Sequence, residues 1–150
     1  MSGFFHSQPL QEGAGHITIF PLSYDSIGQG TWAVYKSSDS AFGHVIWNPS
    51  DTDGDSLLYK LYLSAGTYTF QVLTSANTQL GIINIDIDET NVAFFDCYNA
   101  SALTNVIKRE NNIVISKSGL KTLKVYLNGK NVSSSHYYTN IQYMAIWKTA

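Results

Sequence analysis

The sequence predicts an all-β protein, a jelly-roll-like antiparallel β-sandwich preceded by an extended N-terminal arm. Large apolar residues alternate with small polar ones in residues 66–72 and again in residues 81–88. A two-residue period is that of half-buried strands. Turn residues recur at roughly 8–12-residue intervals, which is typical of sandwiches and barrels. No stretch of comparable length shows the 3.6-residue period of a helix.

Residues 1–15 hold three glycines, one proline and no periodic pattern, which is typical of an extended arm. Phe4 and Phe5 lie in this arm, where two adjacent exposed phenylalanines would lower solubility. We predict that they bind a neighbouring subunit; the alternative is that they fold back onto their own domain. Residues 16–150 are predicted to form a single sandwich domain.

Four short strands are expected in the first half of this domain. Pro21 ends the first of them, a segment rich in glycine and serine precedes the second, and Asn48-Pro49 is a strong turn signal after the third. The expected strands are residues 16–20, 31–35, 43–47 and 57–63.

The second half is predicted to continue the same pattern. Residues 88–91 are a candidate hairpin turn, residues 98–109 are the one weak helical candidate, and a polar loop spans residues 128–140. The expected strands are residues 66–72, 81–88, 92–95, 113–115, 123–127 and 141–147. A total of about nine or ten strands best fits a jelly roll of two four-stranded sheets.

Composition and charge exclude several classes of function. The net charge is −2, and the single arginine is Arg109. Four lysines, Lys117, Lys121, Lys124 and Lys130, are spread among apolar residues, so we expect a solvated face and no nucleic-acid partner. No run of about 18 apolar residues predicts a membrane span, and no secretory signal is visible. We therefore expect a soluble protein made in a cytoplasm.

One acidic loop is a candidate metal site. Asp51, Asp53 and Asp55 place three carboxylates around Gly54, and Ca²⁺ takes several oxygen ligands from flexible loops of this kind. The order D-x-D-G-D differs from that of EF-hand loops. The alternative is therefore an ordinary acidic turn between strands, and no other cofactor is expected.

The sequence does not favour an enzyme. The four histidines are scattered and form no ligand pair, and no G-x-S-x-G motif is present. Asp86 and Asp88 could be drawn as a carboxylate pair, but they lie on the polar face of a strand, where solvation explains them. The single cysteine, Cys97, has apolar neighbours and is expected to be a buried, inert thiol.

Glycan binding is the better small-molecule hypothesis. Sugars stack their C–H faces on aromatic rings while amides and carboxylates bind the hydroxyls, and the chain is rich in both kinds of side chain. The candidate glycan-binding residues are Tyr126, Tyr137 and Tyr138. A protein interface explains exposed tyrosines equally well.

A set of short motifs in the region of residues 57–150 resembles a known family. In order, they are Ser64-Ala65-Gly66-Thr67-Tyr68, Gly81-Ile82, Asp96-Cys97-Tyr98, Ser118-Gly119, Gly129-Lys130-Asn131, Ser133-Ser134-Ser135, Tyr138 and Trp147-Lys148-Thr149. Together they resemble the β-sandwich domains near the C-termini of tailed-bacteriophage structural proteins, such as fibres and capsid-decorating proteins.

This resemblance implies a non-catalytic virion structural protein, made in the host cytoplasm. Its partners would be copies of itself, as a homotrimer, and the major capsid or other virion proteins. The second hypothesis is a carbohydrate-binding module, or a receptor-binding tip that takes up a surface glycan.

Overall fold

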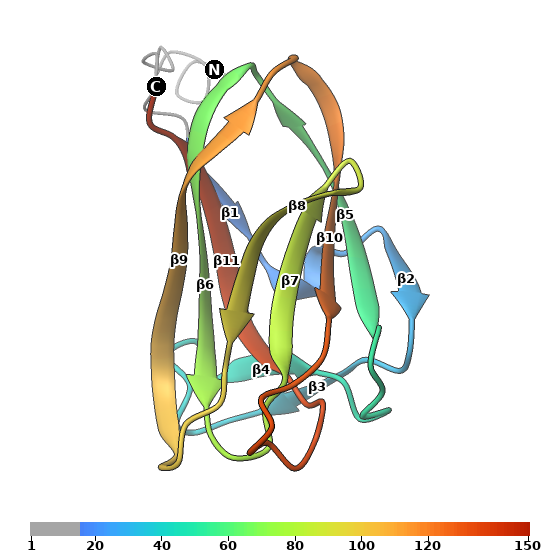
Figure 1. The fold of residues 1–150 in the computed structure, drawn as a ribbon, viewed down its shortest axis with the longest axis vertical. Coiled ribbons are helices and arrows are strands. Elements are labelled where there is room, and N and C mark those ends of the chain that lie inside the picture. Colours follow the sequence, from blue (N-terminus) through green and yellow to red (C-terminus); the bar gives the residue numbers. More distant parts are fainter. Residues whose placement is uncertain (1–15) are drawn as a thin grey trace, which may run out of the picture.

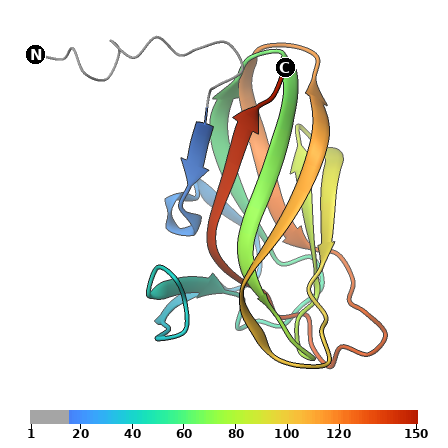
Figure 2. The same ribbon diagram turned by 90° about the vertical axis from the view of Figure 1, so that its left-hand side faces the viewer.

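The computed structural model describes residues 16–150, which form two antiparallel β-sheets packed face to face (Figure 1). Figure 2 shows the same sandwich from the side, with β11, β6 and β9 next to one another. The predicted all-β antiparallel sandwich is confirmed. The predicted arm, with Phe4 and Phe5, lies outside the described residues. Within those residues, no helix is both long and apolar enough to span a membrane.

The first sheet has six strands in the order β3-β4-β11-β6-β9, and β1 also pairs with β11. The strands are β1 (His16–Ile19), β3 (Ala33–Lys36), β4 (His44–Trp47), β6 (Gly66–Ala76), β9 (Leu103–Ile115) and β11 (Asn140–Lys148). Because β1 and β4 pair with different parts of β11, the start of β11 lies at the same end of the sandwich as β3 and β4.

The second sheet has five strands in the order β2-β5-β10-β7-β8. They are β2 (Ser26–Gln29), β5 (Ser56–Leu63), β7 (Ile82–Ile87), β8 (Thr90–Asp96) and β10 (Gly119–Leu127), and a short 3₁₀ turn, η1 (Pro21–Ser23), follows β1. The two sheets therefore hold six and five strands, where the sequence predicted four each.

The core lies between the sheets and is built from the alternating residues that the sequence singled out. Phe70 on β6 and Phe95 on β8 stack across the sandwich, with ring centroids 6.4 Å apart. Fully buried side chains from both sheets surround them: Leu57, Leu63, Ile83, Ile85, Leu123, Leu127, Ile141, Met144, Ile146, Val72 and Val125. The predicted inward faces of residues 66–72 and 81–88 are thus correct.

The predicted helical turn at residues 98–109 is wrong, because most of this segment belongs to the thirteen-residue strand β9. Asn105 and Asn112 have φ of 54° and 62°, and each lies where two residues of β9 oppose one of β6. Such β-bulges insert an extra residue and shift the inward face by one position. The two-residue period is therefore interrupted twice along β9, and its apolar residues imitate helical spacing.

Strand β2 was not predicted, and its sequence explains why. All four of its residues are exposed, and it carries Gly28, so that neither apolar alternation nor strand propensity marks it. Its pairing with β5 forms one edge of the second sheet.

Cys97 is fully buried, as predicted, and its burial raises the pKa of the thiol to about 12. Only the thiolate is a good nucleophile. We therefore expect the folded protein to be inert toward Ellman's reagent near neutral pH, whereas urea-unfolded protein should react rapidly. Comparable reaction rates in the two states would show that Cys97 is accessible.

Candidate functional site

One end of the sandwich carries a pocket lined by aromatic and amide side chains. This loop-end pocket lies at the lower end of the molecule in Figure 1, where β3 and β4 meet the β6–β7 connection and the segment that enters β11. Its volume is about 380 Å³, within the usual range for small-molecule sites. The lining residues are Tyr35, Trp47, Asn77, Gln79, Leu80, Tyr138, Thr139 and Asn140.

The aromatic rings of the pocket form a connected row. The ring centroids of Tyr35 and Trp47 lie 6.1 Å apart at 88°, and those of Trp47 and Tyr138 lie 5.6 Å apart at 66°. His136 extends the row by stacking on Tyr138 at 4.7 Å. Tyr35 is 41% exposed, so part of this aromatic surface is open to solvent. Edge-to-face contacts of this kind hold the rings in fixed orientations.

The polar lining contains two acceptors that the protein leaves unpaired. Thr139 Oγ1 and Asn140 Oδ1 are both buried and have no hydrogen-bond partner. Buried polar atoms nearly always have a partner, and each exception calls for an explanation. Both residues line the pocket, but these two oxygens have almost no accessible surface, so a hydroxyl group of a bound molecule can reach them only after the side chains turn.

Asn48 fixes the segment that carries Tyr138. Its side chain is fully buried at the end of β4. Asn48 Oδ1 accepts from the backbone N–H of Thr139 at 2.7 Å, and Asn48 Nδ2 donates to the carbonyl of Tyr137 at 3.0 Å. The same Nδ2 also donates to Asp55 Oδ2 at 2.9 Å. Asn48 therefore holds the backbone on both sides of Tyr138 against β4.

The candidate calcium ligands Asp51, Asp53 and Asp55 do not converge on one point. Asp51 accepts from the Tyr137 N–H and contacts His136 Nδ1, both at 2.6 Å, and Asp53 accepts from the Gly129 N–H at 2.7 Å. Asp55, which is fully buried, accepts from Asn48, Ser50 and Thr52. No group of three or more acidic, histidine or cysteine side chains in residues 16–150 could hold a metal ion. The acidic loop instead holds the β10–β11 loop in place through the hydrogen bonds of Asp51 and Asp53.

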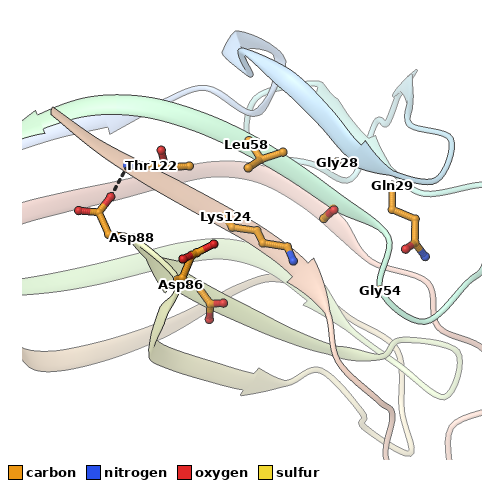
Figure 3. Close-up of a pocket in the computed structure, with 10 residues that line it drawn as sticks. Gly28, Gln29, Gly54, Leu58, Asp86, Asp88, Thr122 and Lys124 are labelled. Carbon is orange, nitrogen blue, oxygen red and sulfur yellow. Dashed lines mark hydrogen bonds between the residues drawn. The ribbon is translucent and has the colours of Figure 1, made fainter.

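A second depression, the sheet groove, lies on the outer side of the five-stranded sheet (Figure 3). It is larger, at about 740 Å³. Figure 3 shows Lys124 between Asp86 on β7 and Gln29 on β2. The lining residues are Gly28, Gln29, Gly54, Ser56, Leu58, Asp86, Asp88, Glu89, Thr122 and Lys124. The groove is thus polar and charged, with no aromatic ring in its lining.

Two of the three carboxylates of the sheet groove, Asp86 and Asp88, accept hydrogen bonds from neighbouring groups. Asp86 Oδ1 accepts from Asn91 Nδ2 at 3.0 Å and from the Tyr126 hydroxyl at 3.2 Å. The backbone N–H of Thr122 donates to Asp88 at 2.9 Å, and this bond, with Lys121 beside it, holds the pKa of Asp88 below its ordinary value. Asp88 therefore stays ionised at neutral pH and is unsuited to donate a proton.

The structure separates the three tyrosines predicted to bind a glycan. Tyr138 lines the loop-end pocket. Tyr137 lies outside that lining, with Lys130 Nζ 4.8 Å from its ring centroid, and Tyr126 borders the sheet groove through Asp86. Their roles in glycan binding stay predictions. Trp47 was not predicted as a site residue, although it lies directly before the Asn48-Pro49 turn, at a strand end where the connecting loops meet.

The fold is that of the β-sandwich carbohydrate-binding modules. No family model matches the chain, and no curated protein matches it in sequence. The chain is similar to the CBM36-1 domain of a multidomain xylanase from the hindgut metagenome of Trinervitermes trinervoides. That match has a TM-score of 0.69 and 16% identity, over 88% of this chain and 96% of the other.

Two further solved structures show the same fold. One is a family 6 carbohydrate-binding module from Clostridium cellulolyticum in complex with xylose, with a TM-score of 0.64 and 17% identity, over 85% of this chain and 94% of that chain. The other is a Paenibacillus xanthan lyase, with a TM-score of 0.66 and 20% identity. The match covers 88% of this chain but only 13% of the lyase. At these identities the likeness establishes the fold alone.

These comparisons overturn the predicted virion role, because the structural neighbours are carbohydrate-binding modules. The predictions that depended on this role are therefore wrong as well: the homotrimer, the capsid partners, and the decoration or fibre function. The motifs behind the resemblance explain the error. Gly66 and Gly119 begin strands, and Gly129, with φ of 79°, lies in a loop. Such motifs mark strand ends and turns, which unrelated β-sandwiches share. They therefore indicate a fold, and a fold does not specify a function.

Proposed function

We propose that this chain is a non-catalytic carbohydrate-binding module that holds a neutral oligosaccharide in the loop-end pocket. The observation that carries the proposal is the combination of an aromatic row with the amide side chains of Asn77, Gln79 and Asn140 in one lining. Sugar rings present apolar C–H faces to aromatic rings and hydroxyl groups to amides. A pocket with both kinds of group matches both sides of a sugar.

The lining also supports a neutral ligand and a binding role. None of the eight residues that line the pocket is charged. An anionic or cationic ligand would find no counter-charge there, and hydrolysis of a glycosidic bond would find no carboxylate pair. The Clostridium cellulolyticum module, which was solved with xylose, shares the fold and makes a pentose or hexose chain a reasonable ligand.

Removal of the rings of Tyr35 and Trp47 tests the proposal. We expect Tyr35→Ala and Trp47→Ala to weaken binding of xylotriose or cellotriose at least about tenfold, because central aromatic side chains carry much of the energy of an interface. Isothermal titration calorimetry measures the affinity, and thermal unfolding confirms that each variant is folded.

Tyr62→Ala is the matched control, because Tyr62 is 63% exposed on β5, in the other sheet. This variant should bind like the unmodified protein. Failure of the unmodified protein to bind any oligosaccharide in a panel of neutral xylo-, cello- and manno-oligosaccharides would contradict the proposal, and so would equal loss of affinity in all three variants.

A further inference from the structure

A second cluster lies on the outer face of the six-stranded sheet, outside the lining of the loop-end pocket. It is defined by His16, Gln71, Arg109, Tyr143 and Trp147, from four adjacent strands. Trp147 and Asn140 are seven residues apart on β11. A strand rises about 3.3 Å per residue, which places Trp147 about 23 Å and Tyr143 about 10 Å from Asn140 along the strand. We refer to these five residues as the arginine cluster.

A buried glutamine fixes the guanidinium of Arg109. Gln71 is paired with Arg109 across β6 and β9 and is only 7% exposed, although it lies on the outward side of its strand. Gln71 Oε1 accepts from both Nε and Nη2 of Arg109. Gln71 Nε2 donates to the Tyr143 hydroxyl at 2.6 Å. Both ends of the glutamine amide are therefore used to orient its neighbours.

Aromatic rings extend the cluster toward β1. The Cζ atom of Arg109 lies 5.5 Å from the centroid of the Trp147 ring. On β1, the His16 ring stacks on Trp147 at 5.6 Å and 9°. Guanidinium groups pack well on indole rings, and such packing restricts their motion further.

This arrangement leaves one side of the guanidinium without a partner. Arg109 is exposed, and among residues 16–150 no carboxylate forms an ion pair with it; the two ion pairs there are Lys121–Asp88 and His136–Asp51. Gln71 Oε1 accepts from Nε and Nη2, which form one edge of the guanidinium. The edge formed by Nη1 and Nη2, which also carries two parallel N–H groups, is therefore open to a ligand. The Tyr143 hydroxyl, having accepted from Gln71, also keeps its own proton to donate.

We propose that the arginine cluster binds the carboxylate of an acidic sugar residue, a hexuronate, through the open fork of Arg109. A planar fork matches a carboxylate with two parallel hydrogen bonds. The free donor of Tyr143 suits a hydroxyl or ring oxygen of the same sugar. The chain would then contact a glycan at two separate places, one neutral and one anionic.

The test compares a charged ligand with its neutral ester. Sodium D-glucuronate and D-galacturonate, and the methyl ester of each, are titrated into ¹⁵N-labelled protein. We expect the Arg109 Nε–H and the Trp147 indole N–H resonances to shift with at least one uronate. Its ester should bind about tenfold more weakly or not at all, because charge-assisted hydrogen bonds are lost. No shift at these resonances, or equal shifts with acid and ester, would overturn the proposal.

Two variants separate charge from geometry. Arg109→Gln removes the charge, and Arg109→Lys keeps the charge but loses the fork, so both should weaken uronate binding. Thermal unfolding checks the fold of each, and the acid–ester comparison on the unmodified protein needs neither variant. Uronate shifts at Trp47 in place of Trp147 would also overturn the proposal. Because neutral oligosaccharides are followed at Trp47 and uronates at Trp147, either proposal can fail while the other stands.

Discussion

Asn48→Asp is expected to lower the free energy of unfolding by about 3 kcal/mol and to weaken glycan binding as well. The substitution keeps the shape of the side chain but replaces its only donor with an acceptor. The new oxygen would face Asp55 Oδ2 and the Tyr137 carbonyl at the 2.9 and 3.0 Å now spanned by hydrogen bonds. It would also place a second carboxylate in a fully buried site.

Urea unfolding at neutral pH measures the loss of stability, and calorimetry with the neutral oligosaccharide measures the loss of affinity. Asn128→Asp is the matched control, because Asn128 is an exposed residue of the β10–β11 loop. It should change the free energy of unfolding by less than about 0.5 kcal/mol. If Asn48→Asp were as stable as this control, Asn48 would not hold the aromatic segment in place.

Gly30→Ala is expected to cost about 3 kcal/mol of stability, for two physical reasons. Gly30 has φ of +83°, which costs an alanine about 1 kcal/mol. A Cβ at this position would also lie 2.0 Å from Asp55 Oδ1 and 2.9 Å from Ser50 Oγ. Forcing the buried Asp55 carboxylate and the Ser50 hydroxyl away from the new Cβ adds about 2 kcal/mol. Asp55 Oδ1, which has no hydrogen-bond partner, is the atom that this Cβ would meet first.

Gly43→Ala separates the two contributions. Gly43 has a similar φ of +74°, but an added Cβ would meet nothing within 4 Å. We expect this control to lose only the backbone part, about 1 kcal/mol. Chemical unfolding of both variants gives the difference. Equal losses at the two positions would mean that the contact with Asp55 is relaxed without cost.

Much of the fold could be predicted from the sequence, because most strands keep a two-residue period. Tyr68, Phe70 and Val72 alternate without interruption, as do Ile83, Ile85 and Ile87, and all six side chains are buried. The period failed where the backbone departs from regular pairing. The bulges at Asn105 and Asn112 concealed β9, and a short exposed edge concealed β2.

The candidate site was harder to predict, because its residues come from four separate segments. Tyr35 and Trp47 lie on neighbouring strands, but Asn77 and Tyr138 reach the pocket only through the topology of the sheets. The acidic loop illustrates the same limit. The spacing of Asp51, Asp53 and Asp55 fits calcium, yet Asp51 and Asp53 accept from Tyr137 and Gly129, which the sequence does not place beside them.

The most direct test of the central proposal follows the indole N–H resonances of the three tryptophans during titration with xylotriose and cellotriose. Trp47 lines the loop-end pocket, Trp32 donates to the Gln29 carbonyl, and Trp147 lies in the arginine cluster. We predict that a neutral oligosaccharide shifts the Trp47 resonance in a saturable manner and leaves the other two unchanged. Saturable shifts confined to the sheet groove, at Thr122 and Lys124, would contradict the proposed site.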